Sequence, residues 1–154
     1  MAEFESPPLE EFGPLLIAGL GQRYNDGSSV GIPALWQRFV PHIGRIPGQI
    51  GGKTYGVICN MDAGSFDYVC GVEVSAFPGR PADFFRISLP KQKYAVFSHV
   101  GHISTIRDTW NMIWKEWLPK SAMRIANVPR LEIYSENFNP ASTSGVEIWI
   151  PIEE

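Results

Sequence analysis

The sequence predicts an α+β domain made of two βαββ-type repeats that are related by a pseudo-twofold axis. We expect an antiparallel sheet with two main helices on one side and a ligand groove on the other. Three observations predict this fold: short segments in which apolar and polar residues alternate, two stretches with apolar residues at helical spacing, and an internal offset that relates the two halves of the chain. The length of 154 residues fits one domain.

The first half of the chain predicts a strand, a helix and two more strands. An apolar stretch over residues 14–24 ends at a turn cluster and predicts the first strand. Residues 28–41 predict a helix, because apolar residues recur on one helical face: Ile32, Leu35, Trp36, Phe39 and Val40. Residues 55–60 and 67–75 then predict a hairpin of two strands.

The second half repeats this order. Residues 84–89 and 94–100 predict strands, although residues 84–89 also fit connecting chain. A strongly amphipathic helix follows over residues 102–118, with its apolar face formed by Ile103, Ile106, Trp110, Ile113, Trp114 and Trp117. Residues 131–135 and 146–152 alternate and predict a second hairpin.

A constant offset of 74 residues relates the two halves of the chain. It joins Trp36 to Trp110, and it joins the Gly-Val-Glu sequence at residues 71–73 to the same sequence at residues 145–147. Two further pairs share the offset: Gly27 with Gly101, and Ile32 with Ile106. Matches at both helix and strand positions indicate an internal repeat. The alternative is that two unrelated βαββ units share these positions by chance.

We divide the chain into a short arm and one domain. Residues 1–13 are expected to form a flexible N-terminal arm, because they contain several Glu and Pro residues and no periodic apolar pattern. Residues 14–154 are expected to form a single domain. Its two repeats should lie at about residues 14–75 and 84–152.

The composition argues against several classes of protein. A net charge of −3 argues against direct nucleic-acid binding, which usually requires a basic excess. Neither a signal peptide nor a membrane-spanning apolar run is expected, and two Cys residues are too few for a disulfide-rich scaffold. We therefore expect a cytoplasmic protein without membrane association. The aromatic content of 12% is higher than a core of this size requires, and it favours a binding pocket.

Two predicted strands near the C-terminus combine carboxylates with aromatic rings. Alternation places Glu132 and Tyr134 on one face of the first of these strands, and Glu147 and Trp149 on one face of the second. The aliphatic residues of both strands lie on the opposite faces: Leu131, Ile133, Val146, Ile148, Ile150 and Ile152. We expect a helix to cover the aliphatic faces, and the acidic and aromatic residues to line a groove between the repeats.

A groove with this lining suits an organic cation. Aromatic faces attract positive charge, most strongly where both partners are partly desolvated. A carboxylate among aromatic rings is unfavourable alone, and a bound cation would neutralise it. The alternative is that Glu132 and Glu147 are ordinary solvated strand residues, as most glutamates are.

Several motifs together resemble the GyrI-like domain, which is the effector-binding part of many AraC- and MerR-type multidrug-responsive regulators. These motifs are the repeat, the helix with Trp at 110, 114 and 117 followed by Leu-Pro, the Leu-Glu-Ile-Tyr sequence at residues 131–134, and the closing strand at residues 146–152. The resemblance covers about residues 14–152. It implies two βαββ-type units around a central groove that accepts small, often cationic molecules.

The resemblance also implies roles for individual residues. The Glu of an E-x-Y pattern is the usual cation partner in this family, and it corresponds to Glu132, with Tyr134 as the aromatic residue two positions later. Stand-alone members exist, including some on integron gene cassettes, and this chain is similar to them. The regulators carry an N-terminal DNA-binding helix-turn-helix module. Residues 1–12 are too short to form one, so we expect no direct binding to nucleic acid.

The complete set of candidate ligand-binding residues also includes aromatic residues of the second helix and the first hairpin. It comprises Glu132, Tyr134, Trp149, Glu147, Trp110, Trp114, Tyr55 and Tyr68. The spacing of Trp110 and Trp114 is also that of core residues, so packing against the sheet is their alternative role.

Three functional hypotheses follow. The first is a module that binds small amphipathic, cationic organic molecules and acts as a sensor or a sequestering protein. The second, implied by some members of the same family, is a hydrolase of reactive electrophiles such as cyclopropane-containing compounds, with Glu132 as general base. The third is an inhibitory protein-interaction module, for example against a topoisomerase. The sequence leaves open whether the chain forms homo-oligomers or binds a protein partner.

We expect no cofactor and no metal site, and we assign no catalytic residue. His99 and His102 lie three residues apart at a predicted strand-to-helix junction, where His102 suits a capping role. No Cys or carboxylate at metal-ligand spacing completes a site with them. A Gly-rich phosphate loop is likewise missing from the sequence.

Overall fold

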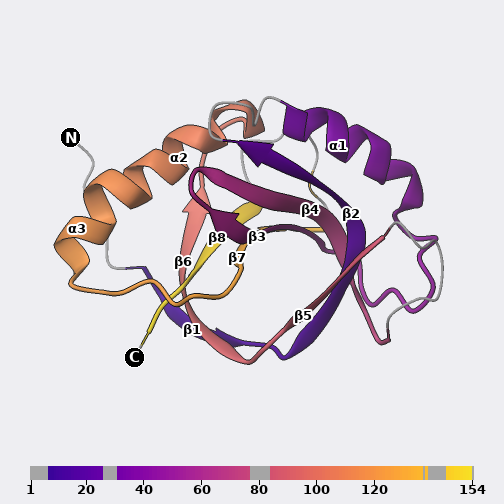
Figure 1. The fold of residues 1–154 in the computed structure, drawn as a ribbon, viewed down its shortest axis with the longest axis horizontal. Coiled ribbons are helices and arrows are strands. Elements are labelled where there is room, and N and C mark those ends of the chain that lie inside the picture. The colour runs from indigo at the N-terminus through magenta and orange to yellow at the C-terminus, as the bar shows by residue number, and fades with distance from the viewer. Residues whose placement is uncertain (1–6, 26–30, 77–83, 137, 139–144, 154) are drawn as a thin grey trace.

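Eight antiparallel strands form one sheet that curls into a half-barrel (Figure 1). The computed structural model describes residues 7–25, 31–76, 84–136, 138 and 145–153. The strands lie in the order β1-β6-β8-β7-β3-β4-β2-β5. Their bounds are β1 Leu9–Phe12, β2 Leu15–Asn25, β3 Thr54–Asp62, β4 Ser65–Val74, β5 Phe85–Leu89, β6 Gln92–His99, β7 Arg130–Tyr134 and β8 Val146–Pro151.

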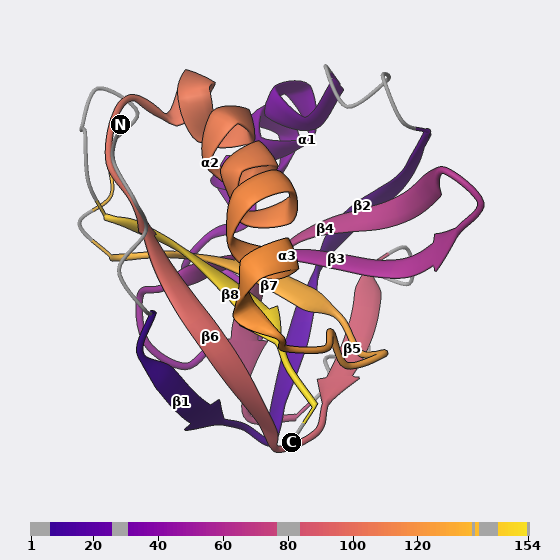
Figure 2. The ribbon, with the colours of Figure 1, turned by 90° about the vertical axis from the view of Figure 1, so that its left-hand side faces the viewer.

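Two helical segments lie on the same outer face of the sheet (Figures 1 and 2). The first is α1 (Ile32–Phe39), which continues as a 3-10 turn. The second contains α2 (Ile106–Met112), a π-helical turn η4 (Ile113–Trp117) and α3 (Leu118–Ser121). No helix in the described ranges combines the length and the apolar content needed to cross a membrane. The predicted α+β class, with two helices on one side of an antiparallel sheet, is confirmed.

The strand order of the sheet is symmetric with respect to the two halves of the chain. Read from the β5 end, each strand of one half stands where its counterpart in the other half stands when the order is read from the β1 end. One half contributes β2, α1, β3 and β4, and the other contributes β6, α2, β7 and β8. The halves meet where β3 pairs with β7 in the middle of the sheet. Each half also has a leading strand that pairs with the other half, since β1 lies against β6 and β5 lies against β2.

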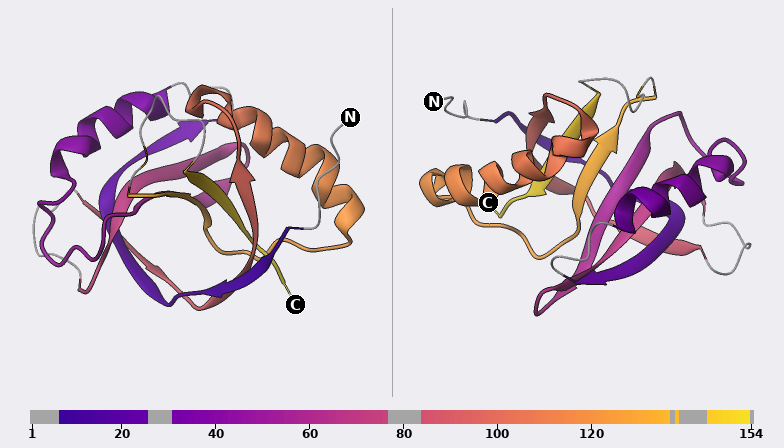
Figure 3. Two further views of the ribbon diagram at one scale, coloured as in Figure 1. Left: turned by 180° about the vertical axis from the view of Figure 1, so that it is seen from behind. Right: turned by 90° about the horizontal axis from the view of Figure 1, so that it is seen from above.

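Each helix covers its own apolar cluster on the outer face. The cluster under α1 contains Leu35 and Phe39 with residues from β2 and β4. The cluster under the second helical segment contains Ile113 and Trp117 with three isoleucines of the C-terminal segment: Ile148, Ile150 and Ile152. The helical faces predicted from the sequence are therefore the faces that pack on the sheet, except at Val40, which follows α1 and is 56% exposed. The middle strands of the sheet lie between the two helical segments (Figure 3).

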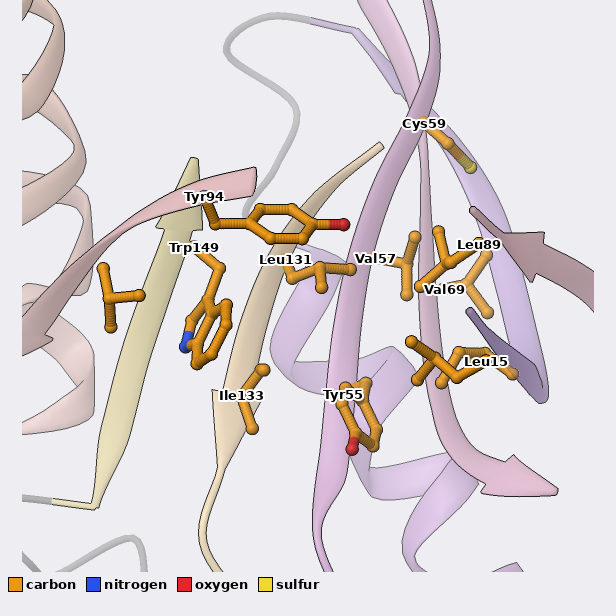
Figure 4. Packing of buried hydrophobic residues seen from close by; sticks show 12 residues of the cluster. Leu15, Tyr55, Val57, Cys59, Val69, Leu89, Tyr94, Leu131, Ile133 and Trp149 are labelled. Carbon is orange, nitrogen blue, oxygen red and sulfur yellow. The ribbon is translucent and has the colours of Figure 1, made fainter. Parts of the chain in front are cut away.

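A third apolar cluster fills the inner, concave face of the half-barrel (Figure 4). Aliphatic residues of the strands from β2 to β7 form most of it, together with three buried rings: Tyr55, Tyr94 and Trp149. Two of these rings, Tyr94 and Trp149, are in contact with each other. The rings are 5.6 Å apart, in an edge-to-face arrangement that is favourable for aromatic pairs. The curled sheet is thus apolar on both faces.

The predicted orientation of β7 is wrong. The register pairs Leu131 with Trp149 and Glu132 with Ile148, and directly paired residues lie on the same face. Leu131 and Ile133 therefore point into the concave core, while Glu132 and Tyr134 point to the helix side, opposite to the predicted groove. The prediction assumed that only one face of the sheet needs an apolar cover. In a half-barrel the concave face needs aliphatic residues as well.

The expected flexible arm is also wrong for part of its length. Residues 9–12 form β1, which pairs with β6 along the edge of the sheet. The Val96 backbone N–H donates to the Pro8 carbonyl over 3.0 Å, and the Phe12 ring lies 5.1 Å from Trp149. Residues 1–6 lie outside the described part of the chain. The apolar residues of β1 are too few to produce a recognisable period in the sequence.

A close approach between β2 and β4 explains how the sheet curls. Gly19 and Gly71 face each other across this strand pair. A Cβ added at Gly19 would lie 1.8 Å from the Cys70 carbonyl oxygen, so no other residue fits there without moving the backbone. Glycine at such a point permits the sharp bend that closes a barrel.

We predict that Phe12 anchors β1 to the core. Phe12→Ala should lower the free energy of unfolding by about 2 kcal/mol, because it removes a ring packed on Trp149. Leu9, on the same strand but 44% exposed, provides the matched control, and Leu9→Ala should change stability by less than about 0.5 kcal/mol. Urea unfolding followed by tryptophan fluorescence measures both. Equal effects would show that the ring contact contributes nothing specific.

Candidate ligand-binding site

Glu132 is a carboxylate buried at the middle of the sheet. It lies on β7, next to Gly56 of β3 and Ile148 of β8, and its side chain points toward the helices. Only 5% of the residue is exposed. A buried carboxylate is costly unless hydrogen bonds or an opposite charge compensate it.

Three neutral donors surround the Glu132 carboxylate. The Tyr68 hydroxyl donates to Oε1 over 2.5 Å, and the Tyr134 hydroxyl donates to the same oxygen over 2.9 Å. The indole N–H of Trp110 donates to Oε2 over 2.8 Å. The indole N–H of Trp36 donates to the Tyr68 hydroxyl over 3.1 Å. We call these five residues the glutamate cluster.

The glutamate cluster draws on four elements of the fold. Strands β7 and β4 supply Glu132, Tyr134 and Tyr68, while α1 supplies Trp36 and α2 supplies Trp110. Because both helices donate to the same network, the cluster connects the two halves of the chain. It does so on the helix side of the central strands β3 and β7.

The Glu132 carboxylate has no counter-ion among the described residues. Every group that contacts the carboxylate is a neutral donor, and the ion pairs between described residues do not include Glu132. A carboxylate accepts about four hydrogen bonds, so three donors leave one acceptor position. The site therefore holds a buried carboxyl group that is hydrogen-bonded but has no ion-pair partner among the described residues.

Burial keeps the tyrosines of the cluster protonated. The pKa of Tyr68 lies well above its usual range, mainly because of burial and then because of the Glu132 charge. The pKa of Tyr134 is raised for the same two reasons, in the same order. Burial, followed by Glu132, also raises the pKa of the Cys70 thiol. All three groups are consequently neutral at physiological pH, and the tyrosines remain hydrogen-bond donors.

Gly56 makes room for the cluster. A Cβ at this position would lie 2.2 Å from the Tyr68 hydroxyl and 2.9 Å from Oε1 of Glu132. Any larger residue would push apart the hydroxyl and the carboxylate. Gly56 is thus required for the hydrogen bond between the Tyr68 hydroxyl and Glu132, which passes over this position.

Aromatic rings from both helices flank the carboxylate. The Trp36 ring meets Tyr134 edge-to-face at 5.0 Å, and Trp110 stacks with Trp114 at 5.9 Å and 25°. Trp36, Trp110 and Trp114 are all only partly buried. They offer ring surface that a bound molecule can reach.

Arg130 borders the same aromatic stack. It lies two residues before Glu132 on β7, and its guanidinium carbon is 4.6 Å from the centre of the Trp114 ring. Burial lowers the pKa of Arg130, and its Nε is a buried donor that has no acceptor among the described residues. The carboxylate and the guanidinium form no ion pair with each other.

Residues 5–153 match the family described as the GyrI-like small molecule binding domain. The chain belongs to this family. It is also similar to the transcriptional regulator BrlR of Pseudomonas aeruginosa (strain PAO1), with 32% identity over 131 residues. The match covers 82% of the chain and 48% of BrlR, so the chain spans about half the length of this relative. The resemblance inferred from the motifs is confirmed.

Several solved structures share this fold over nearly their whole length. The structure of SAV2435 bound to tetraphenylphosphonium has a TM-score of 0.77 at 20% identity, with 97% of this chain and 94% of that chain covered. An integron cassette protein of Vibrio cholerae has a TM-score of 0.73 at 21% identity, with 97% of each chain covered. The C-terminal domain of EcmrR has a TM-score of 0.63 at 15% identity, with 96% of each covered.

This GyrI-like domain brings together five of the eight candidate residues named from its sequence. Glu132, Tyr134, Tyr68 and Trp110 belong to the glutamate cluster, and Trp114 stacks against it.

The other three candidates lie on the concave face, away from the glutamate cluster. Tyr55 and Trp149 are buried in the inner core. The Trp149 indole N–H donates to Glu147 over 3.2 Å, so these two residues pair with each other. They are separated from Glu132 because the pairing of β7 with β8 places Leu131 opposite Trp149 and Ile133 opposite Glu147. The prediction had placed Glu132 and Tyr134 on that face, and a shift of one residue in register exchanges the two faces of a strand.

Trp36 and Gly56 of the site were missed from the sequence. Trp36 could have been found, because the 74-residue offset makes it the counterpart of Trp110. Both indoles donate into the same network from their own helix. Gly56 gives no such signal, because its role depends on which residues the sheet places across from it.

The two histidines considered at the sequence level anchor the second helical segment. The His99 ring contacts the Thr109 hydroxyl over 2.7 Å and the His102 carbonyl over 3.0 Å. The His102 side chain accepts from the Ser104 backbone N–H and caps the helix start. Within the described residues, no three His, Cys, Asp or Glu side chains are placed to hold a metal ion.

We predict that the folded domain ionises its tyrosines only in strong alkali. Burial raises the pKa of all five tyrosines, to about 12 for Tyr55 and Tyr94. The unfolded chain releases these protons near its usual value of 10.0. Burial also raises the pKa of the Cys59 and Cys70 thiols, whose usual value is 9.0. Stability should therefore begin to fall near pH 9 and fall more steeply above pH 10. Phenolate absorbance and urea unfolding from pH 8 to 12 test this; native-state titration near pH 10 would contradict it.

Proposed function

We propose that this chain binds lipophilic organic cations at the glutamate cluster. The observation that carries the proposal is Glu132, a buried carboxylate held by three neutral donors and without a counter-ion among the described residues. SAV2435, whose fold this chain shares, was solved bound to tetraphenylphosphonium, and that ion combines a positive centre with four apolar rings. The chemistry of Glu132 and its neighbours suits a molecule of that kind.

Three physical terms contribute to binding of a cation, and the first two of them favour it over a neutral ligand. The first is the attraction between the ligand charge and Glu132, which is strong because little water screens it. The second is contact with the faces of Trp36, Trp110 and Trp114. The third is burial of apolar ligand surface, at roughly 25 cal/mol per Å². Only the third term is available to a neutral molecule of the same shape.

The symmetric sheet order supports a pseudo-twofold relation between the repeats. We place the axis between β3 and β7, where the halves meet. Trp36 and Trp110 then lie on either side of it and present equivalent rings to one ligand. The residue 74 positions before Glu132 is Ile58, so the other repeat has no acidic counterpart. The proposed site therefore has one Trp from each repeat but only one carboxylate.

We infer a sensor or sequestering role for the domain. BrlR is a transcriptional regulator, and this chain matches about half of its length. EcmrR, whose C-terminal domain has the same fold, was also solved in complex with DNA. We infer that this chain corresponds to the ligand-recognition part of regulators of this kind. We infer a cytoplasmic location on the same grounds.

The hydrogen bonds of Glu132 favour binding over hydrolysis. A general base must lie within hydrogen-bond reach of the proton that it removes, but the Glu132 oxygens already accept three hydrogen bonds from protein donors. The same donors hold the charge in place for a cation. Incubation with a reactive electrophile should therefore give no turnover that depends on Glu132.

We predict that Glu132→Gln weakens tetraphenylphosphonium binding at least about tenfold, or about 1.4 kcal/mol. The substitution removes the charge at nearly constant shape. Binding of neutral triphenylphosphine oxide should change less than about twofold, because it depends on apolar contact. Quenching of tryptophan fluorescence measures both affinities.

Glu147→Gln is the matched control. It removes the same charge from the concave face, where Glu147 pairs with Trp149, and it should leave both affinities unchanged. Equal losses for the cation and the neutral compound in Glu132→Gln would indicate damage to the fold. No loss for either compound would rule out Glu132 as the cation partner.

A further inference from the structure

A cationic side chain lies beside the acidic site. Residues 130, 132 and 134 share one face of β7, so Arg130 and Glu132 point to the same side of the sheet. The guanidinium of Arg130 stacks on Trp114, Trp114 stacks on Trp110, and Trp110 donates to Glu132. The two side chains are therefore connected through the stacked rings of Trp114 and Trp110.

Arg130 carries a hydrogen-bond donor that the described protein does not use. Its Nε is buried and has no acceptor. A buried donor without a partner costs free energy, and a guanidinium cannot escape that cost by losing its proton at neutral pH. An acceptor supplied by a bound molecule would satisfy it.

Packing alone does not account for arginine at this position. The stacking on Trp114 needs a flat or apolar group, and a methionine side chain would cover the ring without leaving a buried donor unpaired. The arginine also places a positive charge next to a site that we propose to bind cations, where it repels a ligand with only positive charge. Both costs disappear when the ligand itself carries an acceptor.

We propose that Arg130 forms a second subsite, which binds an anionic or carbonyl acceptor on the same molecule whose cationic centre lies at Glu132. The inference rests on the proposed function and narrows it. The preferred ligands are dipolar: organic cations with a carboxylate or a similar acceptor. Two residues along a strand span roughly 6.6 Å, which sets the scale of the separation between the two ligand groups.

A matched pair of dyes tests the proposal. Rhodamine B is a zwitterion at neutral pH, and its ethyl ester is a cation of nearly the same shape. We compare the ratio of their dissociation constants in the wild type and in Arg130→Met, using fluorescence anisotropy. The preference for the zwitterion should fall at least about fivefold in the variant, because only rhodamine B loses an ionic partner. Comparing ratios removes the difference in hydrophobicity between the dyes.

Lys115→Met is the control for a general change in charge. It removes one positive charge from an exposed position of the helical turn that carries Trp114, and it should leave the ratio unchanged. If Arg130→Met does not fold, Arg130→Lys replaces it. That variant keeps the charge but loses the planar donor group, and its ratio should also fall.

The two proposals fail in different ways. An unchanged ratio in a folded Arg130 variant, or an equal change in Lys115→Met, would overturn the second subsite. Glu132→Gln tests the cation site separately and should weaken both dyes. Loss of both dyes in Glu132→Gln with an unchanged Arg130 ratio would leave the cation site and remove only the acceptor subsite.

Discussion

The burial of one carboxylate in the middle of the sheet constrains much of this structure. Glu132 is stable there only because donors reach it from β4, from its own strand and from α2, with α1 one hydrogen bond further away. Each donor needs its element at a fixed distance from β7. The two helices, the register of β3 and β7, and the glycine at position 56 are all conditions for the same network.

The curl of the sheet determines where this network can form. A curled sheet has an inner face that must be filled, and here aliphatic and aromatic side chains fill it. The outer face is covered by α1 at one end and by the second helical segment at the other. On the outer face, only a polar network on the middle strands can be reached by side chains of both helical segments. The position of the candidate site is thus a consequence of the architecture.

Much of the fold could be predicted from the sequence, because alternation and helical spacing are local signals. The predicted strand over residues 14–24 corresponds to Leu15–Asn25, and the predicted hairpin over residues 131–152 corresponds to β7 and β8. The faces of β7 could not be predicted in this way. A shift of one residue in register exchanges them, and register depends on the partner strand. That single shift separated Trp149 from Glu132.

In the function that we propose, the donors on Glu132 also influence which ligands the site selects. Tyr68, Tyr134 and Trp110 already satisfy most of the carboxylate's capacity for hydrogen bonds. A neutral ligand can add at most one hydrogen bond, at the one acceptor position that the three donors leave open. A cation adds the Coulomb attraction to the carboxylate, which no neutral donor supplies. In the function that we propose, the donors therefore favour charge over hydrogen bonding as the basis of recognition.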